Sequence, residues 1–412
     1  MQYGLIGEKL THSFSREVHG QLFDYEYELK EIPKEALNDF MIKREFKAIN
    51  VTIPYKQDVL PYLYYVSDTA RSIGAVNTVV NKNGKLYGYN TDFYGLKALI
   101  EKENIEIENK KVLILGNGGT SKTALAVAKH LNAKEILKVS RSVKSGCITY
   151  EQAIKDHSDA DVIINTTPCG MYPDIDSVAI DIDNFSNLSG VVDVVYNPLS
   201  TALVNKARKK GIKATGGLYM LVTQASVSAE KFTCVKVSKE QNDAVFRKIE
   251  NGKKNIVLTG MPSSGKSTVG KILSDMLNME FIDTDSEIEK LKGISTSDIF
   301  QRVGEDGFRD IETQVIKNIC TRQHCVIATG GGAILRQENI DRLKLNGKIY
   351  FIDRPLNELQ ATANRPLSSD REKLKKRFDE RYDIYLSTAD FTLKSKPTAE
   401  ENAEIIAKDF LK

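Results

Sequence analysis

Tryptophan is absent from this chain of 412 residues, and histidine and cysteine are scarce, with five of each. The cysteines stand at positions 147, 169, 234, 320 and 325. An odd and scattered set does not make a disulfide framework, so we expect free thiols and a reducing compartment. Cys320, His324 and Cys325 lie close together but lack a second half-site. We interpret them as a helix end that leads into a strand.

Long apolar runs and an excess of one charge are also missing. No run of about 18 apolar residues occurs, and residues 1–7 lack the charged and then apolar order of a signal peptide. The net charge of +3, from 58 Lys and Arg against 55 Asp and Glu, does not favour nucleic acid or a membrane surface. We expect a cytoplasmic protein that binds small polar or anionic molecules, without nucleic-acid or membrane partners. The oligomeric state stays open.

The length fits two or three domains, each with its own core. Apolar strand patterns alternate with helical ones, which predicts an α/β protein. We expect strands over 3–7, 26–32, 48–53, 110–115, 135–139, 161–165, 191–195, 255–259 and 326–329, and a hairpin over 78–87 that turns at Asn83-Gly84. Helices are expected over 68–73, 123–131, 218–231 and 267–277. Residues 237–254 are polar and charged, as in a connector.

The segment 260–268 (GMPSSGKST) has the P-loop spacing, in which two glycines four residues apart are followed by Lys and Ser. Its backbone N–H groups can converge on phosphate oxygens, Lys266 can reach the β- and γ-phosphates, and the Ser267 hydroxyl suits magnesium. The helix that follows would point its N-terminus at the anion. The sequence therefore predicts an ATP site with Ser263, Ser264, Gly265, Lys266, Ser267 and Thr268 at the phosphates.

A second glycine-rich loop occupies positions 116–120 and lies between an expected strand and an expected helix of a βαβ unit. It comprises Gly116, Asn117, Gly118, Gly119 and Thr120, and Ser121 replaces the usual third glycine. After the next strand, Ser140 and Arg141 stand where an NAD site would carry an acidic residue. A guanidinium pairs with a 2′-phosphate, so the pattern favours NADP over NAD. The alternative is that Arg141 is an ordinary surface residue.

Over about residues 1–247 the chain resembles shikimate dehydrogenase in several motifs that follow one order. They are HSFS at 12–15, NVTIPYK at 50–56, IGAVNT at 73–78, GYNTD at 88–92, NTTP at 165–168, DVVYNP at 193–198, and GLYML at 217–221 ahead of Gln224. The resemblance implies a two-lobed enzyme. Its α/β substrate domain would span 1–95, completed by 218–247, and its Rossmann-like NADP domain would span 96–217.

Reduction of a ketone by NADPH needs a proton donor at the developing alkoxide, and Lys56 is the candidate. The resemblance implies that Lys56 and Asp92 form the catalytic pair and that Ser13 and Ser15 hold the substrate carboxylate. Neutral hydrogen bonds would come from Thr52, Asn77, Asn90, Tyr196 and Gln224, and Gly217 would join the cofactor-binding residues. From the residues alone, Ser13 is at least as plausible as a helix cap.

The remainder, from about residue 253, resembles shikimate kinase, a P-loop kinase related to nucleoside monophosphate kinases. The matching motifs are FIDTD at 281–285, GEDGFR at 304–309 with Glu312, GGG at 330–332, RPL at 365–367, and Arg381 ahead of Tyr385. The kinase domain would span 255–412, after a linker over 248–254. Residues 359–364 lack the additional basic residue that many shikimate kinases carry in the lid region.

The kinase resemblance also implies roles for individual residues. Asp285 would bind and help deprotonate the accepting hydroxyl, Asp283 would hold magnesium through water beside Ser267, and Lys266 would act on the phosphates. Arg309 and Arg381 would clamp the carboxylate with bidentate geometry, and Glu312 would orient Arg309. Gly331 and Gly332 would bring backbone N–H groups to the substrate, and Arg365 would cover the transferred phosphate.

The motifs together predict a bifunctional enzyme with NADP(H), ATP and Mg²⁺ as cofactors. It would reduce 3-dehydroshikimate to shikimate and then phosphorylate shikimate to shikimate 3-phosphate, two steps toward chorismate and the aromatic amino acids. One alternative is an NAD-preferring quinate/shikimate dehydrogenase fused to the kinase. The other is a ligand-binding regulator that has lost catalysis. The intact Lys56, Asp92, Lys266, Ser267 and Asp285 argue against the regulator.

Overall fold

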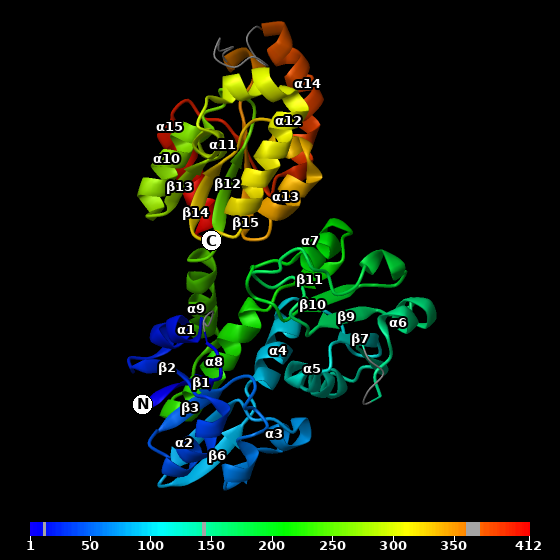
Figure 1. The fold of residues 1–412 in the computed structure, drawn as a ribbon, viewed down its shortest axis with the longest axis vertical. Coiled ribbons are helices and arrows are strands. Elements are labelled where there is room, and N and C mark those ends of the chain that lie inside the picture. Colours follow the sequence, from blue (N-terminus) through cyan, green and yellow to red (C-terminus); the bar gives the residue numbers. More distant parts are fainter. Residues whose placement is uncertain (11–13, 142–145, 360–370) are drawn as a thin grey trace. The chain divides into compact units, whose positions relative to one another are not determined.

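The structure, a computed structural model, describes residues 1–10, 14–141, 146–359 and 371–412. The chain divides into two compact units, Met1–Ile249 and Glu250–Lys412 (Figure 1). Two residues with predicted roles, Ser13 and Arg365, lie outside the described residues. Within the described ranges, no helix has both the length and the apolar character needed to cross a membrane.

The first lobe of unit 1 contains a six-stranded mixed sheet in the order β2-β1-β3-β5-β6-β4. Its strands are β1 (Tyr3–Gly7), β2 (Tyr27–Glu31), β3 (Ala48–Val51), β4 (Tyr65–Val66), β5 (Thr78–Lys82) and β6 (Lys85–Tyr89). The helices of this lobe are α1 (Ser15–Leu22), α2 (Leu37–Lys43) and α3 (Asp68–Ile73). Strand β1 is parallel to β2 and β3, and β5 is antiparallel to β3 and β6. The β5–β6 hairpin turns at Asn83 and Gly84, both with positive φ, as predicted.

The second lobe of unit 1 contains a parallel sheet in the order β11-β10-β9-β7-β8. Its strands are β7 (Lys111–Leu115), β8 (Glu135–Val139), β9 (Val162–Asn165), β10 (Gly190–Asp193) and β11 (Lys213–Thr215), with helices α4 (Asp92–Lys102), α5 (Gly119–His130), α6 (Tyr150–Asp156) and α7 (Ala202–Lys209). Val112 and Ile114 belong to one apolar cluster, and Leu113 and Leu115 to another. Both faces of the sheet are therefore buried, and this explains why its strands are continuous apolar runs in the sequence.

Two helices complete unit 1. Helix α8 (Leu218–Thr233) packs on the first lobe, where the Phe232 ring stacks on Tyr3 with ring centroids 5.7 Å apart. Helix α9 (Lys239–Asn251) occupies most of the segment 237–254, for which the sequence indicated a polar connector and no helix. Val245 and Ile249 of α9 are buried together with residues of α8. The two apolar side chains stand four residues apart on one helical face, and the charged residues around them masked this pattern.

Unit 2 contains a parallel sheet in the order β13-β14-β12-β15-β16 with helices on both faces (Figure 1). Its strands are β12 (Asn255–Thr259), β13 (Glu280–Asp283), β14 (Cys325–Ala328), β15 (Gly347–Asp353) and β16 (Phe391–Lys394), and its helices are α10 (Lys266–Leu277), α11 (Thr284–Lys292), α12 (Thr296–Ile319), α13 (Gln337–Leu343), α14 (Arg371–Thr388) and α15 (Ala399–Phe410). Ile256 and Leu258 enter one apolar cluster and Val257 the other. The α/β class with parallel sheets is thus confirmed. The carboxyl ends of β12, β13 and β14 bring three motif-bearing loops to one edge of the sheet.

Candidate active sites

A cavity of about 500 Å³ in unit 1 is lined by residues of both lobes. Predicted residues that line it are Ser15, Thr52, Lys56, Asn77, Asp92, Thr120, Tyr196, Gly217 and Gln224. These positions are spread over some 200 residues of sequence, and the fold of the unit brings them together. The cavity therefore joins the predicted substrate residues to the start of helix α5, where the first glycine-rich loop ends.

The most closely paired charges in this cavity belong to Lys56 and Asp92. Lys56 Nζ donates to Asp92 Oδ2 at 2.6 Å, and the two side chains are 19% and 11% exposed. Asp92 is the first residue of α4, where the positive end of the helix dipole favours a carboxylate. The Lys56 carbonyl accepts the Val76 N–H at 2.8 Å, which fixes the backbone at the lysine. Both partners are thus held in place before any ligand binds.

Asn77 connects this pair to the start of α4. Its Nδ2 donates to Asp92 Oδ1 at 2.9 Å and to Thr91 Oγ1 at 3.0 Å. Its Oδ1 accepts the Thr91 N–H at 2.7 Å. Asn77 therefore lines the cavity and also orients Asp92. Thr91 was not assigned a role from the sequence, although it lies inside the GYNTD motif.

The lining of the cavity differs from the prediction at two other asparagines, Asn90 and Asn50. The Asn90 side chain is buried and donates to the Ala75 carbonyl at 3.0 Å, and Asn90 is not among the described residues that line the cavity. Its contact with substrate stays a prediction. Asn50, which the sequence did not single out, lines the cavity and accepts a hydrogen bond from Tyr27 Oη at 2.8 Å. Its position at the start of the NVTIPYK motif was the available indication.

The remaining predicted substrate residues are neutral. Gln224 Oε1 accepts from Thr91 Oγ1 at 3.4 Å, and Gln224 Nε2 donates to the Leu221 carbonyl at 2.9 Å. Burial raises the pKa of Tyr196, so its hydroxyl stays protonated and can donate. The Tyr196 ring meets Phe14 edge-on, with centroids 5.2 Å apart. These groups can bind hydroxyls and a carboxylate without adding charge.

The first glycine-rich loop connects β7 to α5. Gly116 has a φ of 107°, and a β-carbon there would lie 2.8 Å from Thr166 Oγ1, so both backbone and space require glycine. At Gly118 and Gly119 a β-carbon would meet no described atom within 4 Å, so this side of the loop is open. Helix α5 begins at Gly119, earlier than predicted, and presents its N-terminal N–H groups there. The loop fits a dinucleotide pyrophosphate.

Arg141 and its neighbours follow the end of strand β8. The Ser140 N–H donates to the Ile148 carbonyl at 2.9 Å, and Arg141 is exposed. Lys138 on β8 also reaches the loop, with Nζ 3.5 Å from Asn117 Oδ1. Two cationic side chains therefore stand near the end of β8, and their chemistry fits a phosphate on the ribose.

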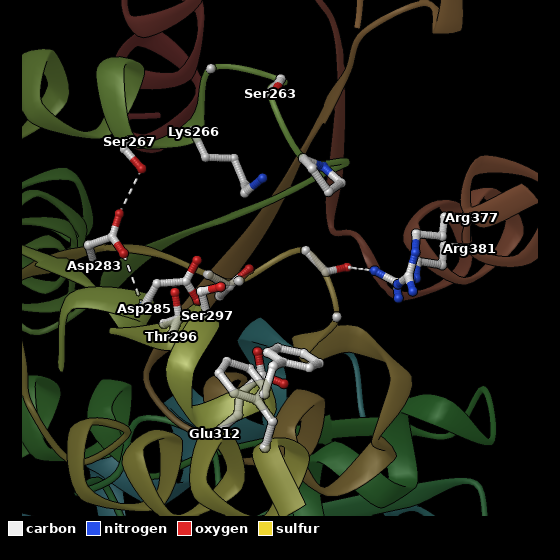
Figure 2. Close-up of a pocket in the computed structure, with 18 of the residues that line it drawn as sticks. Ser263, Lys266, Ser267, Asp283, Asp285, Thr296, Ser297, Glu312, Arg377 and Arg381 are labelled. Atoms are coloured by element: carbon white, nitrogen blue, oxygen red, sulfur yellow. Dashed lines mark hydrogen bonds between the residues drawn. The ribbon is translucent and has the colours of Figure 1, made fainter. Parts of the chain in front are cut away.

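A cavity of about 750 Å³ in unit 2 brings the kinase motifs together (Figure 2). Predicted residues that line it are Ser263, Gly265, Lys266, Ser267, Thr268, Asp283, Asp285, Arg309, Gly331, Gly332 and Arg381. Ser264 is instead buried within the loop, where its N–H donates to the Met261 carbonyl at 3.1 Å. The lining also includes Arg354 and Arg377, which no motif indicated.

The lysine of the P-loop makes hydrogen bonds to the backbone of the same loop. Lys266 Nζ donates to the carbonyls of Gly260 and Met261, each at 2.9 Å. Ser267 Oγ donates to Asp283 Oδ2 at 2.7 Å (Figure 2). Asp283 Oδ1 accepts the Asp285 N–H at 3.0 Å and caps α11. A hydroxyl and a carboxylate held this close are hard oxygen ligands, and they fit a Mg²⁺ ion beside the phosphates.

The glycine turn after β14 allows charged side chains to meet. A β-carbon on Gly330 would lie 2.7 Å from Asp285 Oδ1 and from Glu312 Oε1, and one on Gly332 would lie 2.1 Å from Arg309 Nη2. A larger residue at either position would therefore displace these charged side-chain ends. Arg309 Nη1 donates to Glu312 Oε2 at 2.7 Å. Burial raises the pKa of Glu312, and the Arg309 guanidinium opposes that rise.

Helix α14 contributes Arg377 and Arg381 to this cavity. Arg381 Nη1 donates to the Gly331 carbonyl at 3.0 Å (Figure 2). Tyr385, one turn later, donates to the Gly260 carbonyl at 2.9 Å and also contacts the Gly331 carbonyl. Burial raises the pKa of Tyr385, so its hydroxyl remains a donor. Helix α14 thus holds the P-loop and the glycine turn at a fixed separation.

Comparison with known proteins separates the chain into the same two parts. Residues 5–79 match the family described as shikimate dehydrogenase substrate binding domain, and residues 262–411 match the family described as shikimate kinase. The chain is 37% identical over 264 residues to the shikimate dehydrogenase (NADP(+)) of Clostridium beijerinckii, covering 60% of this chain and 98% of the relative. It is 37% identical over 256 residues to that of Methanococcus vannielii, covering 56% and 90%.

Solved structures agree with these matches. The chorismate mutase/shikimate 5-dehydrogenase fusion protein of Clostridium acetobutylicum aligns with a TM-score of 0.57 at 37% identity, covering 60% of this chain and 96% of that one. The shikimate 5-dehydrogenase of Thermus thermophilus, in complex with NADP(H) and shikimate, aligns with a TM-score of 0.55 at 26% identity, covering 60% and 99%. The chain therefore belongs to the shikimate dehydrogenase family, and its C-terminal part carries a shikimate kinase domain.

Proposed function

We propose that this chain is a bifunctional enzyme that reduces 3-dehydroshikimate with NADPH and phosphorylates the resulting shikimate with ATP. The observation that carries the proposal is the presence of two separate cavities, each with a nucleotide-binding loop beside groups suited to a hydroxylated acid. Residues 1–95 with 218–247 would bind the substrate of the first step, and 96–217 its cofactor. Residues 255–412 would catalyse the second step, and 248–254 would connect the halves.

In the first step, the loop over 116–120 would hold NADPH, which would supply a hydride to the ring ketone. Lys56 donates a proton to the ketone oxygen as it becomes a hydroxyl, and then recovers a proton from solvent. Asp92 holds the ammonium through the 2.6 Å hydrogen bond, and Asn77 keeps Asp92 in that orientation. Neutral donors bind the carboxylate and the other hydroxyls, and Ser13 and Asn90 remain in that proposed set with Ser15, Thr52, Tyr196 and Gln224.

In the second step, ATP with Mg²⁺ supplies the γ-phosphoryl group. Lys266 donates to the Gly260 and Met261 carbonyls and would donate to phosphate oxygens when ATP is bound. Ser267 and Asp283 would hold the ion. Asp285 accepts the proton of the attacking hydroxyl, while Arg309 and Arg381 hold the carboxylate. Most of the catalysis here comes from positioning and from neutralised charge. Arg365 stays a predicted contact to the phosphate.

Small acids and nucleotides are the proposed partners, and the cytoplasm is the proposed compartment. Each of the five cysteines is a free thiol. Free thiols support a reducing environment, in which structural disulfides are rare.

Each half can be tested by itself on the purified chain. We expect 3-dehydroshikimate to drive NADPH oxidation faster than NADH oxidation, and shikimate to drive ADP formation from ATP. Faster NAD⁺-linked oxidation of quinate than NADP⁺-linked oxidation of shikimate would favour the quinate alternative. Binding of shikimate without NADPH oxidation or ADP formation would identify a regulator.

A further inference from the structure

The cavity of unit 2 contains more guanidinium groups than the two assigned to the substrate carboxylate. Arg377 precedes Arg381 by four residues on α14, so the two lie one turn apart on the same face. Both line the cavity together with Arg309 of α12. In Figure 2, Arg377 and Arg381 lie together on α14, across the cavity from Asp283 and Asp285. Neither the motifs nor the proposed mechanism uses Arg377.

The three guanidinium groups converge on one carboxylate, that of Glu305. Arg309 Nη2 lies 3.3 Å from Glu305 Oε1, Arg381 Nη2 lies 3.9 Å from the same oxygen, and Arg377 Nη2 lies 4.0 Å from Oε2. Glu305 follows Gly304, where a φ of 71° and a ψ of −174° break helix α12. The break places Glu305 at the centre of the arginines, so their charged ends must lie near one another.

Charge within this cluster is not balanced. Among the described residues, two carboxylates, those of Glu305 and Glu312, lie within 4.0 Å of the three guanidinium groups. Arg309 takes the close contact with Glu312 at 2.7 Å. Arg377 and Arg381 are left with Glu305 at distances too long for a hydrogen bond. Their side chains are 15% and 4% exposed, so water compensates them poorly.

The electrostatics of Arg377 agree with this imbalance. Burial lowers the pKa of Arg377, and the neighbouring Arg381 lowers it further, while Glu305 opposes the shift. Glu380, on the exposed side of α14, opposes it as well. In addition, Arg381 Nε is buried and has no hydrogen-bond partner among the described residues. The cluster therefore has one positive charge and donor groups left for an anion.

We propose that Arg377 is a third guanidinium of the acid-binding clamp and contacts the substrate carboxylate together with Arg309 and Arg381. Glu305 holds the three arginines together and competes with the acid for them. The inference rests on the proposed kinase function of this cavity. Arg377 would then determine the affinity for the acid but not the affinity for the nucleotide.

The alternative is that Arg377 only pairs with Glu305 and fixes the break in α12. The two roles predict opposite results for Glu305→Gln. If Arg377 only pairs with Glu305, removing either charge breaks the same ion pair, and both variants lose the same amount of affinity for the acid. If Arg377 serves the acid, Glu305→Gln removes a competitor, and affinity for the acid rises or stays the same.

The full chain provides the test. Shikimate binding is measured by calorimetry, and kinase KM and kcat are measured for Arg377→Met, Arg377→Lys and Glu305→Gln. Lys376→Met is the matched control, because it removes one exposed charge from the neighbouring position on the same helix. We expect Arg377→Met to raise Kd and KM for shikimate about tenfold to hundredfold, with kcat and the KM for ATP nearly unchanged. Arg377→Lys should have a smaller effect, and Lys376→Met none.

Three results would overturn the inference. They are an unchanged Kd in Arg377→Met, an equal rise of Kd in Arg377→Met and Glu305→Gln, and a parallel rise of the KM for ATP in Arg377→Met. Failure of the proposed function is a separate outcome, because the unmodified chain would then form no ADP from shikimate and ATP.

Discussion

The two cavities of this chain are built from different chemistry although they are proposed to bind the same acid. The cavity of unit 1 has one close ion pair, Lys56–Asp92, among neutral donors such as Tyr196 and Gln224. The cavity of unit 2 is lined by Lys266 and four arginines. Hydride transfer needs one proton donor at one oxygen, whereas phosphoryl transfer must neutralise several oxygens at once. The extra positive charge of unit 2 has two proposed roles. Lys266 acts at the phosphate oxygens, and the arginines of α12 and α14 hold a carboxylate that neutral donors would hold in unit 1.

The largest expected effect is the loss of kinase activity alone when one carboxylate of the unit 2 cavity is removed. Asp285→Asn keeps the shape of the side chain but removes the carboxylate that we propose as the base for the accepting hydroxyl. We expect kinase kcat to fall about 10²- to 10⁴-fold, with NADPH oxidation unchanged. The measurement is ADP release at saturating shikimate and ATP. Asp275→Asn, at an exposed position of α10, is the control and should match the unmodified chain. Kinase activity within twofold of normal in Asp285→Asn would contradict the assignment.

The next effect concerns the orientation of Asp92. Asn77→Ala removes the 2.9 Å hydrogen bond to Asp92 Oδ1, which contributes roughly 1.5–3 kcal/mol because it involves a charged group. Dehydrogenase kcat/KM should fall about tenfold to hundredfold, mostly in kcat, and kinase rates should not change. Initial-rate measurements against 3-dehydroshikimate test this, with the exposed Asn187→Ala as control. A change confined to KM would mean that Asn77 only binds substrate.

Salt sharpens the comparison without any mutation. Attraction between an approaching anion and a cluster of cations is largely screened beyond about 8–10 Å at moderate ionic strength, whereas neutral hydrogen bonds are not. Raising salt from about 0.05 to 0.5 M should therefore raise the KM for shikimate of the kinase about threefold or more at saturating ATP. The KM of the dehydrogenase, at saturating nucleotide, should change less. Equal salt dependence in the two halves would remove the proposed difference between the cavities.

The smallest expected effect concerns the loss of unfolding free energy of unit 1 in acid. Burial lowers the pKa of His19 from 6.5 to about 3, and its ring stacks on Tyr27 with centroids 4.0 Å apart. The unfolded chain binds this proton near pH 6.5 and the folded unit does not. Stability is therefore complete above pH 6.5 and falls toward pH 3, by up to about 1.4 kcal/mol per pH unit.

His19→Phe keeps an aromatic ring but removes the titration. Between pH 7 and pH 5, the unfolding free energy of the variant should fall by about 1–2 kcal/mol less than that of the unmodified chain. The unfolding free energy is measured by urea titration at each pH, with hydrogen exchange of the α1 amides as the probe of unit 1. An identical loss in both proteins would show that other groups control the acid response.

Much of the fold could be predicted because its strands are short apolar runs between turns. The strands over 3–7, 135–139 and 255–259 have the predicted bounds. Helix α9 was missed because its buried face consists of few apolar residues among many charged ones. Helix α5 begins at Gly119 with Gly118 as its N-cap, four residues before the predicted start, because glycine discourages helix formation in isolation and hid the first turn.

The sites were predictable to the extent that they lie in contiguous motifs. Lys56 and Asp92 are 36 positions apart, and their pairing needed the family resemblance and then the fold. Thr91 and Asn50 lie inside motifs but were overlooked, because their hydrogen bonds run to partners distant in sequence. Arg377 belongs to no motif. Its proposed role rests on the approach of Arg377 on α14 to Glu305 on α12, which only the tertiary structure reveals.

The central claim, that two independent sites on one chain catalyse consecutive steps, has one direct test. The full chain is supplied with 3-dehydroshikimate, NADPH and ATP, and NADP⁺ and ADP are followed together for the unmodified protein, Lys56→Ala and Lys266→Ala. We predict that the unmodified chain forms both products. Lys56→Ala should lose NADPH oxidation but still phosphorylate added shikimate, and Lys266→Ala should keep NADPH oxidation but form no ADP. Loss of both activities in either variant, or of neither in both, would contradict the account.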